Sequence, residues 1–395
     1  MVKYHLGEKI FMTGSATQKP VKVQIVFAAD DNYCQHMTAA MASILLNSRK
    51  GNEFVFHVLH GELSDDNKQK IEKLKNLRSF NLYFYDMRNV DFSELPLNRD
   101  YISVATYYRL YILDVLPKQL DKVLYMDCDM IAEGDVAELF QTNINRFMAA
   151  VAEDEGSKYQ SDRMGFAAGV RYFNAGMVLF NLEKMRKTDF RRHCFDWFRK
   201  HKKIVILQDQ DILNGVFSGK VKYVSLAWNA NGRLYRRNEI EHFYSEQEEI
   251  EAKQNPKIIH FTDRNKPWHV KCNHPLRYEY WKYLAYTSFA GAVYSYRIKR
   301  ILYNLCCIHE DFFNKKLKIF GVTLIKVKSI FPKKAWYVLG FPVFSLEKKD
   351  FRKIYTIMGC SLAFYDRFEK LNYELETINN NLCRLSSLLE KSVHR

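Results

Sequence analysis

The chain has 395 residues, of which 47% are hydrophobic and 27% charged, with few glycines and prolines. This composition excludes a fibre or a disordered chain, and the length suits one large α/β domain with an appendage, or two domains. The formal net charge is +15, and residues 286–363 alone hold fourteen Lys and Arg against four Asp and Glu. A basic segment of this kind either attracts an anionic partner or forms a solvated surface without one.

The cysteines and the N-terminus predict a cytoplasmic protein. Eight cysteines are scattered along the chain without a CxxC pair, which is typical of reduced thiols rather than of a disulfide framework. The first residues, MVKYHLGEKIFMTG, lack the basic start, apolar stretch and cleavage site of a signal peptide. No run of about eighteen apolar residues occurs, so we expect no membrane-spanning helix.

The first third of the chain alternates apolar runs of strand length with stretches of helical periodicity. Ser64, followed by two aspartates, is a typical helix N-cap. Such alternation predicts a mainly parallel sheet covered on both faces, with ligands bound beyond the carboxyl ends of the strands. Acidic clusters at Asp30–Asn32 and Asp127–Asp129 follow two of these strands and so predict one site. The expected strands are 22–29, 53–60, 81–87 and 122–127, and the expected helices include 33–48 and 103–115.

Beyond residue 285 the sequence changes character. The segments LKIFGVTLIKVK (317–328) and WYVLGFPVFSLEKK (336–349) have a glycine at equivalent places and indicate a small duplicated β-like unit. In the last segment, eight apolar residues follow a 4-3-4-3 spacing. This spacing predicts a coiled coil, with an amphipathic helix docked on its own domain as the alternative. The predicted parts are a lead-in (1–21), an α/β domain (22–285), a basic aromatic extension (286–363) and a helix with a heptad seam (364–395).

The Asp127-Cys128-Asp129 triplet is the first motif that carries chemistry. A DxD motif alone is weak, but this one follows an apolar strand, so its carboxylates lie at the edge of a sheet. Oxygen ligands suit Mn²⁺ or Mg²⁺, which commonly complete their coordination with substrate phosphates. A divalent cation there would stabilise the charge that accumulates on a diphosphate leaving group.

The segment HFTDRNKPWH (260–269) adds a third ligand type. His260, at the end of a predicted strand, would complete the metal site, because imidazole suits Mn²⁺. Lys266 would contact the diphosphate as a point charge. A single histidine is more often structural, but together with the DxD motif and Lys266 the ligand interpretation is favoured.

Two further motifs are individually weak. FNAG (173–176) offers the Asn174 amide to hydroxyl groups, with a glycine that permits close approach. LQDQDILN (207–214) places Asp209 and Gln210 at a predicted helix start, where an acidic residue is often only a favourable contact with the helix dipole.

Six motifs together resemble the family-eight retaining glycosyltransferases in order and spacing, and in particular the bacterial lipooligosaccharide and lipopolysaccharide galactosyl- and glucosyltransferases. The resemblance covers about residues 22–285. It implies a GT-A fold, dependence on Mn²⁺ (with Mg²⁺ as the other candidate) and a UDP-hexose donor. The motifs are AADDNY (28–33), TYYRL (106–110), LYMDCD (124–129), YFNAGMVLFNL (172–182), QDQDILNG (208–215) and HFTDRNKPWH (260–269).

The resemblance also implies roles for individual residues. Those expected to hold the donor nucleotide, its sugar and its phosphates are Ala28, Asp30, Asn32, Arg109, Asp127 and Lys266. Those expected to bind the metal are Asp127, Asp129 and His260. Those expected to line the pocket in which the sugar is transferred are Asn174, Asp209 and Gln210.

One position departs from the family. The family usually has glycine three residues after the metal-binding histidine, where this chain has Asp263. A carboxylate there would repel the diphosphate unless it turns towards a basic neighbour such as Arg264. This departure puts a backbone contact to phosphate in doubt, but not the class of reaction.

The predicted reaction is transfer of galactose or glucose from a UDP-sugar to a saccharide acceptor of a bacterial surface glycan, with retention. No carboxylate in the motifs is an unambiguous nucleophile, and Gln210 is a poor one, so front-side attack is favoured over a covalent intermediate. The alternative is a catalytically idle sugar-nucleotide-binding or scaffold protein, against which the intact metal motif argues. A nucleic-acid-binding protein is disfavoured, because the chain has no nucleic-acid-binding motif.

The C-terminal part predicts two further partners. Basic residues interleaved with aromatic ones over 292–353 favour contact with the inner face of the cytoplasmic membrane, where a lipid-linked acceptor would be presented. The alternative is a small subdomain packed on the catalytic domain. The heptad seam at 364–395 predicts a homo-oligomer.

Overall fold

The computed structural model describes residues 19–97, 103–235, 242–262 and 264–305, and then the strands of a second sheet between Ile308 and Tyr365. The chain divides into two compact units, Met1–Tyr294 and Ser295–Arg395. Of the predicted heptad helix, only Phe364 and Tyr365 belong to the described residues, and they end the last strand. The remainder of that prediction, 366–395, lies outside the described part of the chain.

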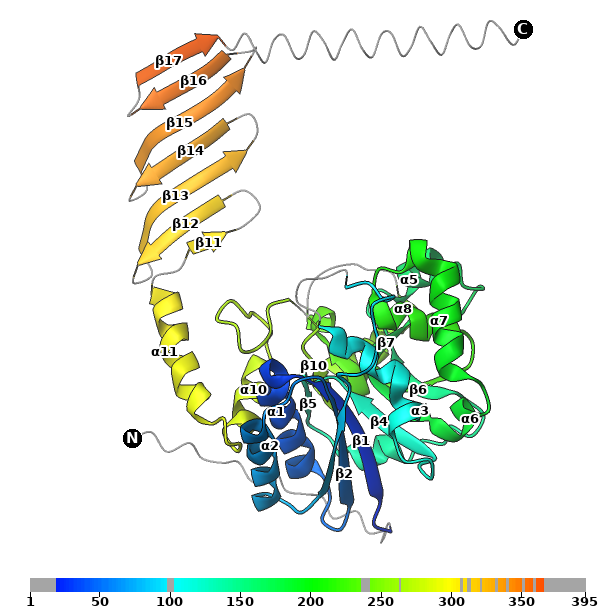
Figure 1. The fold of residues 1–395 in the computed structure, drawn as a ribbon. Helices are drawn as coiled ribbons and strands as arrows, with labels where there is room; N and C mark the ends of the chain where they lie inside the picture. Colours follow the sequence, from blue (N-terminus) through cyan, green and yellow to red (C-terminus); the bar gives the residue numbers. More distant parts are fainter. Residues whose placement is uncertain are drawn as a thin grey trace, which may run out of the picture. The chain divides into compact units, whose positions relative to one another are not determined.

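The first unit is built on a seven-stranded sheet in the order β3-β2-β1-β4-β7-β6-β8 (Figure 1). Strands β3, β2, β1 and β4 run parallel, whereas β7 is antiparallel to both of its neighbours. The predicted mainly parallel α/β sheet is therefore confirmed. Its strands are β1 (Lys22–Ala29), β2 (Glu53–His60), β3 (Asn81–Asp86), β4 (Lys122–Met126), β6 (Ala149–Glu153), β7 (Phe173–Asn181) and β8 (Val221–Tyr223).

A small second sheet lies beyond the end of β4 and positions the site. It has the order β5-β10-β9, with β5 (Met130–Ala132), β10 (Ile258–His260) and β9 (Ala230–Asn231). Strand β10 runs antiparallel to β5, and His260 pairs with Met130. This pairing brings the end of β10 next to the DxD motif, which immediately precedes β5.

Helices cover both faces of the large sheet, with α1, α2 and α10 on one side and α6, α7 and α8 on the other (Figure 1). Asp30 caps α1 by accepting a hydrogen bond from the backbone N–H of Tyr33, and Ser64 caps α2 as predicted. Between the helices and the sheet lies a core of fully buried apolar side chains. The helices are α1 (Asp31–Asn47), α2 (Asp65–Glu72), α3 (Ile112–Val115), α4 (Val136–Phe140), α5 (Ser157–Arg163), α6 (Leu182–Arg186), α7 (Phe190–His201), α8 (Gln208–Phe217), α9 (Glu246–Gln254) and α10 (Arg277–Leu284).

The helix expected at 103–115 is mostly a 3₁₀ helix, Val104–Tyr111, with a short α-helical end. The predicted helix is confirmed, but most of it is wound more tightly than an α-helix. Arg109 lies in this tightly wound segment and is buried. Its side chain turns back and donates a hydrogen bond to the backbone carbonyl of Thr106.

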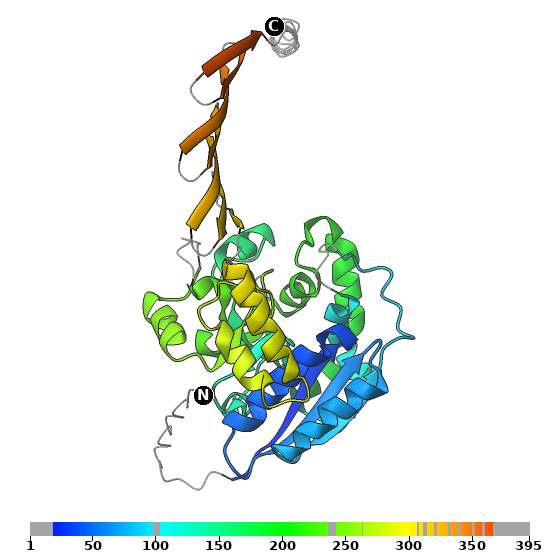
Figure 2. The same ribbon diagram turned by 90° about the vertical axis from the view of Figure 1, so that its left-hand side faces the viewer.

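The second unit contains an antiparallel sheet whose strands are paired in sequence order, preceded by α11 (Gly291–Leu305), which crosses the boundary between the units. Figure 2 shows this sheet nearly edge-on as a single layer. The two predicted β-like segments form β12 with β13 and β14 with β15. The strands are β11 (Ile308–Glu310), β12 (Asn314–Ile319), β13 (Val322–Ile330), β14 (Lys333–Val338), β15 (Phe341–Lys349), β16 (Arg352–Ile357) and β17 (Cys360–Tyr365).

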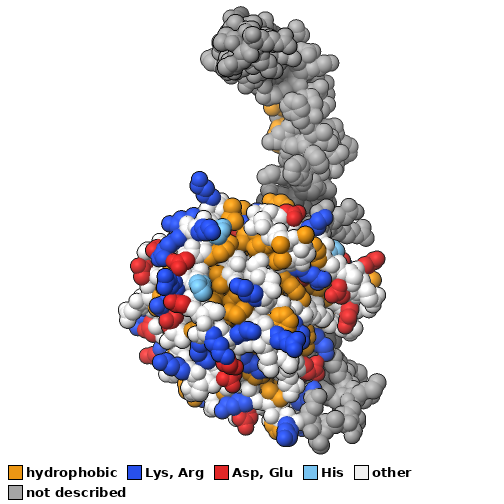
Figure 3. All heavy atoms as spheres, turned by 90° about the vertical axis from the view of Figure 1, so that its right-hand side faces the viewer, with side chains coloured by type: hydrophobic (Ala, Val, Ile, Leu, Met, Phe, Trp, Pro, Cys, Tyr) orange, Lys and Arg blue, Asp and Glu red, His pale blue; other side chains and the backbone are white. Residues whose placement is uncertain are grey.

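The described surface of the first unit does not present a single sign of charge. On the face in Figure 3, Lys and Arg are interspersed with Asp and Glu around a central group of hydrophobic side chains. The sequence already places a net excess of ten positive charges in 286–363, fourteen against four. Within the described part of the chain, no helix combines the length and apolar character needed to cross a membrane.

Candidate active site

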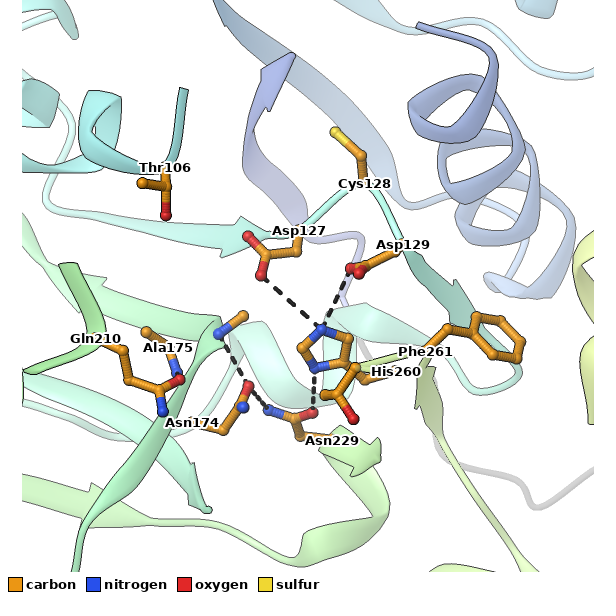
Figure 4. A network of polar contacts seen from close by, with 12 residues as sticks. Thr106, Asp127, Cys128, Asp129, Asn174, Ala175, Gln210, Asn229, His260 and Phe261 are labelled. Carbon is orange, nitrogen blue, oxygen red and sulfur yellow. Dashed lines mark hydrogen bonds and ion pairs between the residues drawn. The ribbon is translucent and has the colours of Figure 1, made fainter. Parts of the chain in front are cut away.

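The site begins where β4 ends. Asp127 and Asp129 follow the buried strand Lys122–Met126, and His260 is the last residue of β10. The Nε2 atom of His260 lies 3.2 Å from Oδ1 of Asp129 and 3.9 Å from Oδ2 of Asp127 (Figure 4). One ligand atom from each of the three side chains lies within 4.8 Å of the others. The structure thus brings together the three residues predicted to bind a metal.

A chain of hydrogen bonds determines which nitrogen of His260 faces the two aspartates. The backbone N–H of Gly176 donates to Oδ1 of Asn174 at 3.0 Å, so the other donor to this oxygen is Nδ2 of Asn229, at 2.9 Å (Figure 4). Asn229 therefore presents Oδ1 to Nδ1 of His260, at 2.9 Å. Nδ1 carries the proton, and Nε2 is left with a lone pair directed at the aspartates, as a metal ligand requires.

The three residues fit a divalent cation in two further respects. Oδ1 of Asp129 is buried and accepts no hydrogen bond of good geometry, although buried carboxylate oxygens are normally satisfied. Burial would raise the pKa of the Asp129 carboxyl, but the positive charge of Lys266 and the hydrogen bond that it donates lower this pKa well below its usual range. The carboxylate is therefore ionised, and two carboxylates with one imidazole suit Mn²⁺ or Mg²⁺.

Gly176 allows this close approach. A Cβ atom at position 176 would lie 2.3 Å from Cε1 of His260 and 2.9 Å from Oδ2 of Asp127. Any other residue would therefore displace the imidazole or the carboxylate. The glycine of the FNAG motif therefore makes room for His260 and Asp127 rather than for a turn.

Lys266 lies directly beside the triad. Its Nζ donates to Oδ2 of Asp129 at 2.6 Å and to the carbonyl of Phe261 at 2.7 Å, and the residue is only 7% exposed. A third ammonium proton remains for an anionic ligand. This arrangement agrees with the predicted role beside a diphosphate, which stays a prediction.

Arg109 connects the metal triad with the predicted transfer pocket. Its guanidinium donates to Oδ1 of Asp127 at 2.7 Å and to the carbonyl of Ala175 at 2.6 Å, and Nε lies 3.1 Å from Oδ2 of Asp209. The side chain is almost fully buried and lies over the ring of Tyr125. Arg109 therefore fixes the carboxylates on either side of it, in addition to any contact with the donor.

Asp209 and Gln210 lie at the start of α8, opposite the triad. Burial raises the pKa of Asp209 to about 6, against the lowering effects of Arg109 and of the hydrogen bond from Thr106. Gln210 accepts a hydrogen bond from the backbone N–H of Ala175 at 2.9 Å and donates to Asp154 at 3.3 Å. Both side chains are thus held in place by neighbours within the same site.

A cavity of about 400 Å³ unites these residues, a volume suited to a small-molecule substrate. Most of the predicted site residues line this cavity. They are Ala28, Asp30, Arg109, Asp127, Asp129, Asn174, Asp209, Gln210, His260 and Lys266. Asn32 is not among the lining residues and is exposed in the first turn of α1. Asp263 lies outside the described residues.

Several lining or supporting residues were missed from the sequence. Asn229 orients His260 from a 3₁₀ helix that no sequence motif marks. Gln208 begins α8 in the left-handed region, with φ of 52°, and its Nε2 is buried without a partner. Among these missed residues, Asp154 and Glu155 could have been found from the sequence, because they are two acidic residues directly after a strand, as in the DxD motif.

The fold and the site define a protein of the α/β class with three residues at the carboxyl end of its sheet that could hold a metal ion. Residues 24–272 match the family described as glycosyl transferase family 8. The chain belongs to this family, and the expectation of a UDP-sugar-dependent glycosyltransferase is confirmed.

Individual relatives agree with this assignment. The chain is 27% identical over 270 residues to general stress protein A of Bacillus subtilis, covering 67% of this chain and 94% of that protein. It is 26% identical over 258 residues to the lipopolysaccharide 1,3-galactosyltransferase of Salmonella typhimurium, covering 63% and 73% of the two chains. It is 24% identical over 256 residues to the lipopolysaccharide 1,2-glucosyltransferase of Escherichia coli K12, covering 64% and 75%.

A solved structure shares the fold of the first unit. The galactosyltransferase LgtC, crystallised with donor and acceptor sugar analogues, is 29% identical to the chain with a TM-score of 0.61. The match covers 68% of this chain and all of that one. The predicted GT-A fold is therefore confirmed for the α/β part of the chain.

Proposed function

We propose that the chain is a retaining hexosyltransferase that moves galactose or glucose from a UDP-sugar to a saccharide acceptor of a bacterial surface glycan. The observation that carries this proposal is the triad Asp127, Asp129 and His260 with Lys266 beside it, in a cavity of about 400 Å³. Relatives named as lipopolysaccharide glucosyl- and galactosyltransferases support the sugars and the acceptor class.

The metal in this proposal is Mn²⁺ or Mg²⁺, bound by the triad. When bound, it would stabilise as a Lewis acid the charge that develops on the diphosphate. Arg109 fixes Asp127, and Asn229 holds the His260 ring. Lys266 supplies a positive charge next to the cation position.

Front-side attack is supported by the hydrogen bonds and ion pairs that already engage the carboxylates near the predicted transfer pocket. Asp209 is held by Thr106 and Arg109, and Asp154 accepts hydrogen bonds from Asn174 and Gln210. A carboxylate engaged in this way is a poor nucleophile. In the proposed reaction the acceptor hydroxyl attacks the anomeric carbon from the face that the diphosphate leaves, and a phosphate oxygen takes the hydroxyl proton.

Asp211 has a structural role in this proposal. It is fully buried and accepts hydrogen bonds from the backbone N–H groups of Ile206 and Leu207, at 2.7 and 2.9 Å. The side chains of Arg163 and Tyr172 also donate to it, each at 2.5 Å. A sugar adduct trapped on Asp209 or Asp211 of the native enzyme and detected by mass spectrometry would refute front-side attack.

The first experiment measures UDP release from a panel of UDP-sugars with and without Mn²⁺. We expect metal-dependent turnover of one donor, lost in Asp129→Ala and kept in Asp196→Ala, which changes an exposed aspartate on α7. Product NMR then shows whether the anomeric configuration is retained. If no donor turns over with bacterial glycan acceptors present, the scaffold alternative is favoured, and Asp263→Gly is the next variant to assay.

For the C-terminal part we propose contact with an anionic membrane surface. Ile298 and Ile301 are 60% and 58% exposed on α11, and Tyr294, one turn earlier, is 72% exposed. Arg297, Lys299 and Arg300 lie among them, which is the pattern of a helix that lies in a membrane interface. Flotation of the full chain with anionic but not neutral liposomes is the expected result, and absence of flotation refutes the proposal.

A further inference from the structure

Trp268 is a residue of the HFTDRNKPWH segment that neither the candidate metal triad nor the predicted diphosphate contact explains. Its ring lies face to face with the ring of His36 in α1, with the ring centroids 3.4 Å apart and an angle of 9° between the planes. Trp268 is not among the described residues that line the cavity. Any effect of this side chain on the reaction therefore has to pass through other residues.

The His36 ring is itself held in place by α10, which packs against α1. The hydroxyl of Tyr280 lies 2.8 Å from Nδ1 of His36 and accepts a hydrogen bond from Nε2 of Gln35 at 2.9 Å. The Tyr280 ring also packs against Trp268, with the centroids 5.2 Å apart. Burial lowers the pKa of His36 to about 3, so the imidazole is neutral near pH 7 and the stack does not depend on a charge. Helices α1 and α10 thus form one platform for the indole ring.

The backbone on either side of Trp268 is fixed as well. Nε1 of Trp281 in α10 donates a hydrogen bond to the carbonyl of Pro267 at 3.0 Å, and both residues are buried. The backbone N–H of His269 donates to the carbonyl of Lys266 at 2.8 Å, and the N–H of Lys266 donates to Nδ1 of His269 at 3.3 Å. Residues 266–269 therefore form a closed turn that a ring fastens to α1 and a hydrogen bond fastens to α10.

This turn determines where the ammonium group of Lys266 lies. Nζ is placed between Oδ2 of Asp129, at 2.6 Å, and the carbonyl of Phe261, at 2.7 Å. A lysine side chain is a flexible four-carbon stem, so its ammonium keeps one position only if the backbone that carries it is fixed. A displacement of about 1 Å in such a group costs a reaction about 100-fold in rate. The support of the turn is therefore as important as the charge.

We propose that Trp268 is a positioning residue whose ring, stacked on His36, holds the turn that presents the Lys266 ammonium to the diphosphate of the donor. This inference rests on the proposed function, because the diphosphate contact of Lys266 belongs to it. The property that Trp268 controls is recognition of the phosphates, and not of the nucleoside. A structural role alone would lower the stability of the chain without changing how strongly it prefers a nucleotide with phosphates over one without.

The test measures the preference for UDP over uridine, which is the dissociation constant of uridine divided by that of UDP. Calorimetry with Mn²⁺ present gives both constants, with uridine measured by its competition with UDP. Tyr33 lines the cavity and meets the Trp268 ring edge-on, but an effect that both ligands share cancels in the ratio. We expect Lys266→Ala to lower the preference at least about tenfold, because charge-assisted hydrogen bonds are strong. Trp268→Leu should lower it at least about fivefold, and Trp268→Phe, which keeps a ring on His36, less than about twofold.

Trp197→Leu is the matched control. Trp197 is also half-buried and stacked on a histidine, His201, with the centroids 4.4 Å apart, but it lies on α7 and does not line the cavity. This variant should keep the native preference for UDP. The double variant Trp268→Leu with Lys266→Ala should lose no more of the preference than Lys266→Ala alone, because the ring acts only through the lysine.

A folded Trp268→Leu variant that keeps the native preference, or whose loss adds fully to that of Lys266→Ala, would overturn the proposal and leave the proposed function intact. An unchanged preference in Lys266→Ala would instead refute the diphosphate contact of Lys266, and with it this inference. If Trp268→Leu does not fold, Trp281→Phe decides, because it keeps an aromatic ring and removes the hydrogen bond to the carbonyl of Pro267. It should lower the preference at least about threefold, as expected for one lost hydrogen bond, and a smaller change would overturn the proposal.

Discussion

Replacing Asn229 by alanine removes the group that orients His260. Asn229 is fully buried, and its amide links Oδ1 of Asn174 with Nδ1 of His260 at 2.9 Å on either side. Without it, the imidazole is free to rotate or to carry its proton on Nε2, where the metal would bind. The variant keeps all three predicted metal ligands, so it tests the supporting network and not the triad itself.

The expected loss follows from the role of such supporting groups. Removing a partner that orients a ligating histidine typically lowers metal affinity by about 10- to 100-fold, equivalent to about 1.4–2.8 kcal/mol of binding free energy. The loss of two buried hydrogen bonds also lowers the free energy of unfolding by about 1–3 kcal/mol. Asn181→Ala is a matched control, because Asn181 is buried and hydrogen-bonded to Ile144 and Phe147 away from the site.

The assay is a Mn²⁺ titration of UDP release, together with the free Mn²⁺ signal in electron paramagnetic resonance with UDP present. We expect Asn229→Ala to need at least tenfold more Mn²⁺ for half-maximal rate, with much of the maximal rate recovered at saturation. Asn181→Ala should lose stability but keep its Mn²⁺ affinity. Equal Mn²⁺ affinities in the native chain and Asn229→Ala would refute the reasoning.

Three further predictions use other parts of the first unit. Gly176→Ala would place a Cβ atom 2.3 Å from His260, and it should lower Mn²⁺-dependent UDP release at least about 100-fold. Gly291→Ala is the control, because Gly291 has open space around it, and it should leave UDP release unchanged. Arg109→Lys should lower the free energy of unfolding in urea by about 3 kcal/mol, because one ammonium cannot replace the guanidinium between buried carboxylates; a loss below about 1 kcal/mol would contradict this. Burial lowers the pKa of His57 to about 4. As the pH falls below about 6.5, the histidine is therefore protonated in the unfolded chain but stays neutral in the folded one. This difference lowers the free energy of unfolding by about 2 kcal/mol by pH 5. Urea unfolding at pH 7.5 and pH 5 measures this loss, and His57→Gln should not show it. If the native chain and the variant lose the same free energy of unfolding between the two pH values, His57 is not a neutral buried histidine.

The sequence by itself predicted the fold of the first unit and the three residues that meet as a candidate metal site. Hydrophobic periodicity marks strands and helices, and the carboxyl ends of parallel strands meet at one edge of a sheet, so the aspartates after β4 could be assigned to a site. Ser64 as a helix cap was predictable from local sequence too, because capping depends on neighbours within one turn.

Only the tertiary structure decided how the site is completed. Asn229 and His260 are 31 residues apart and meet because β9 and β10 pair, and no local pattern records such a contact. Arg109 forms ion pairs with Asp127 and with Asp209, which is 100 residues away from it in the sequence. The need for glycine at 176 exists only because His260 folds against it.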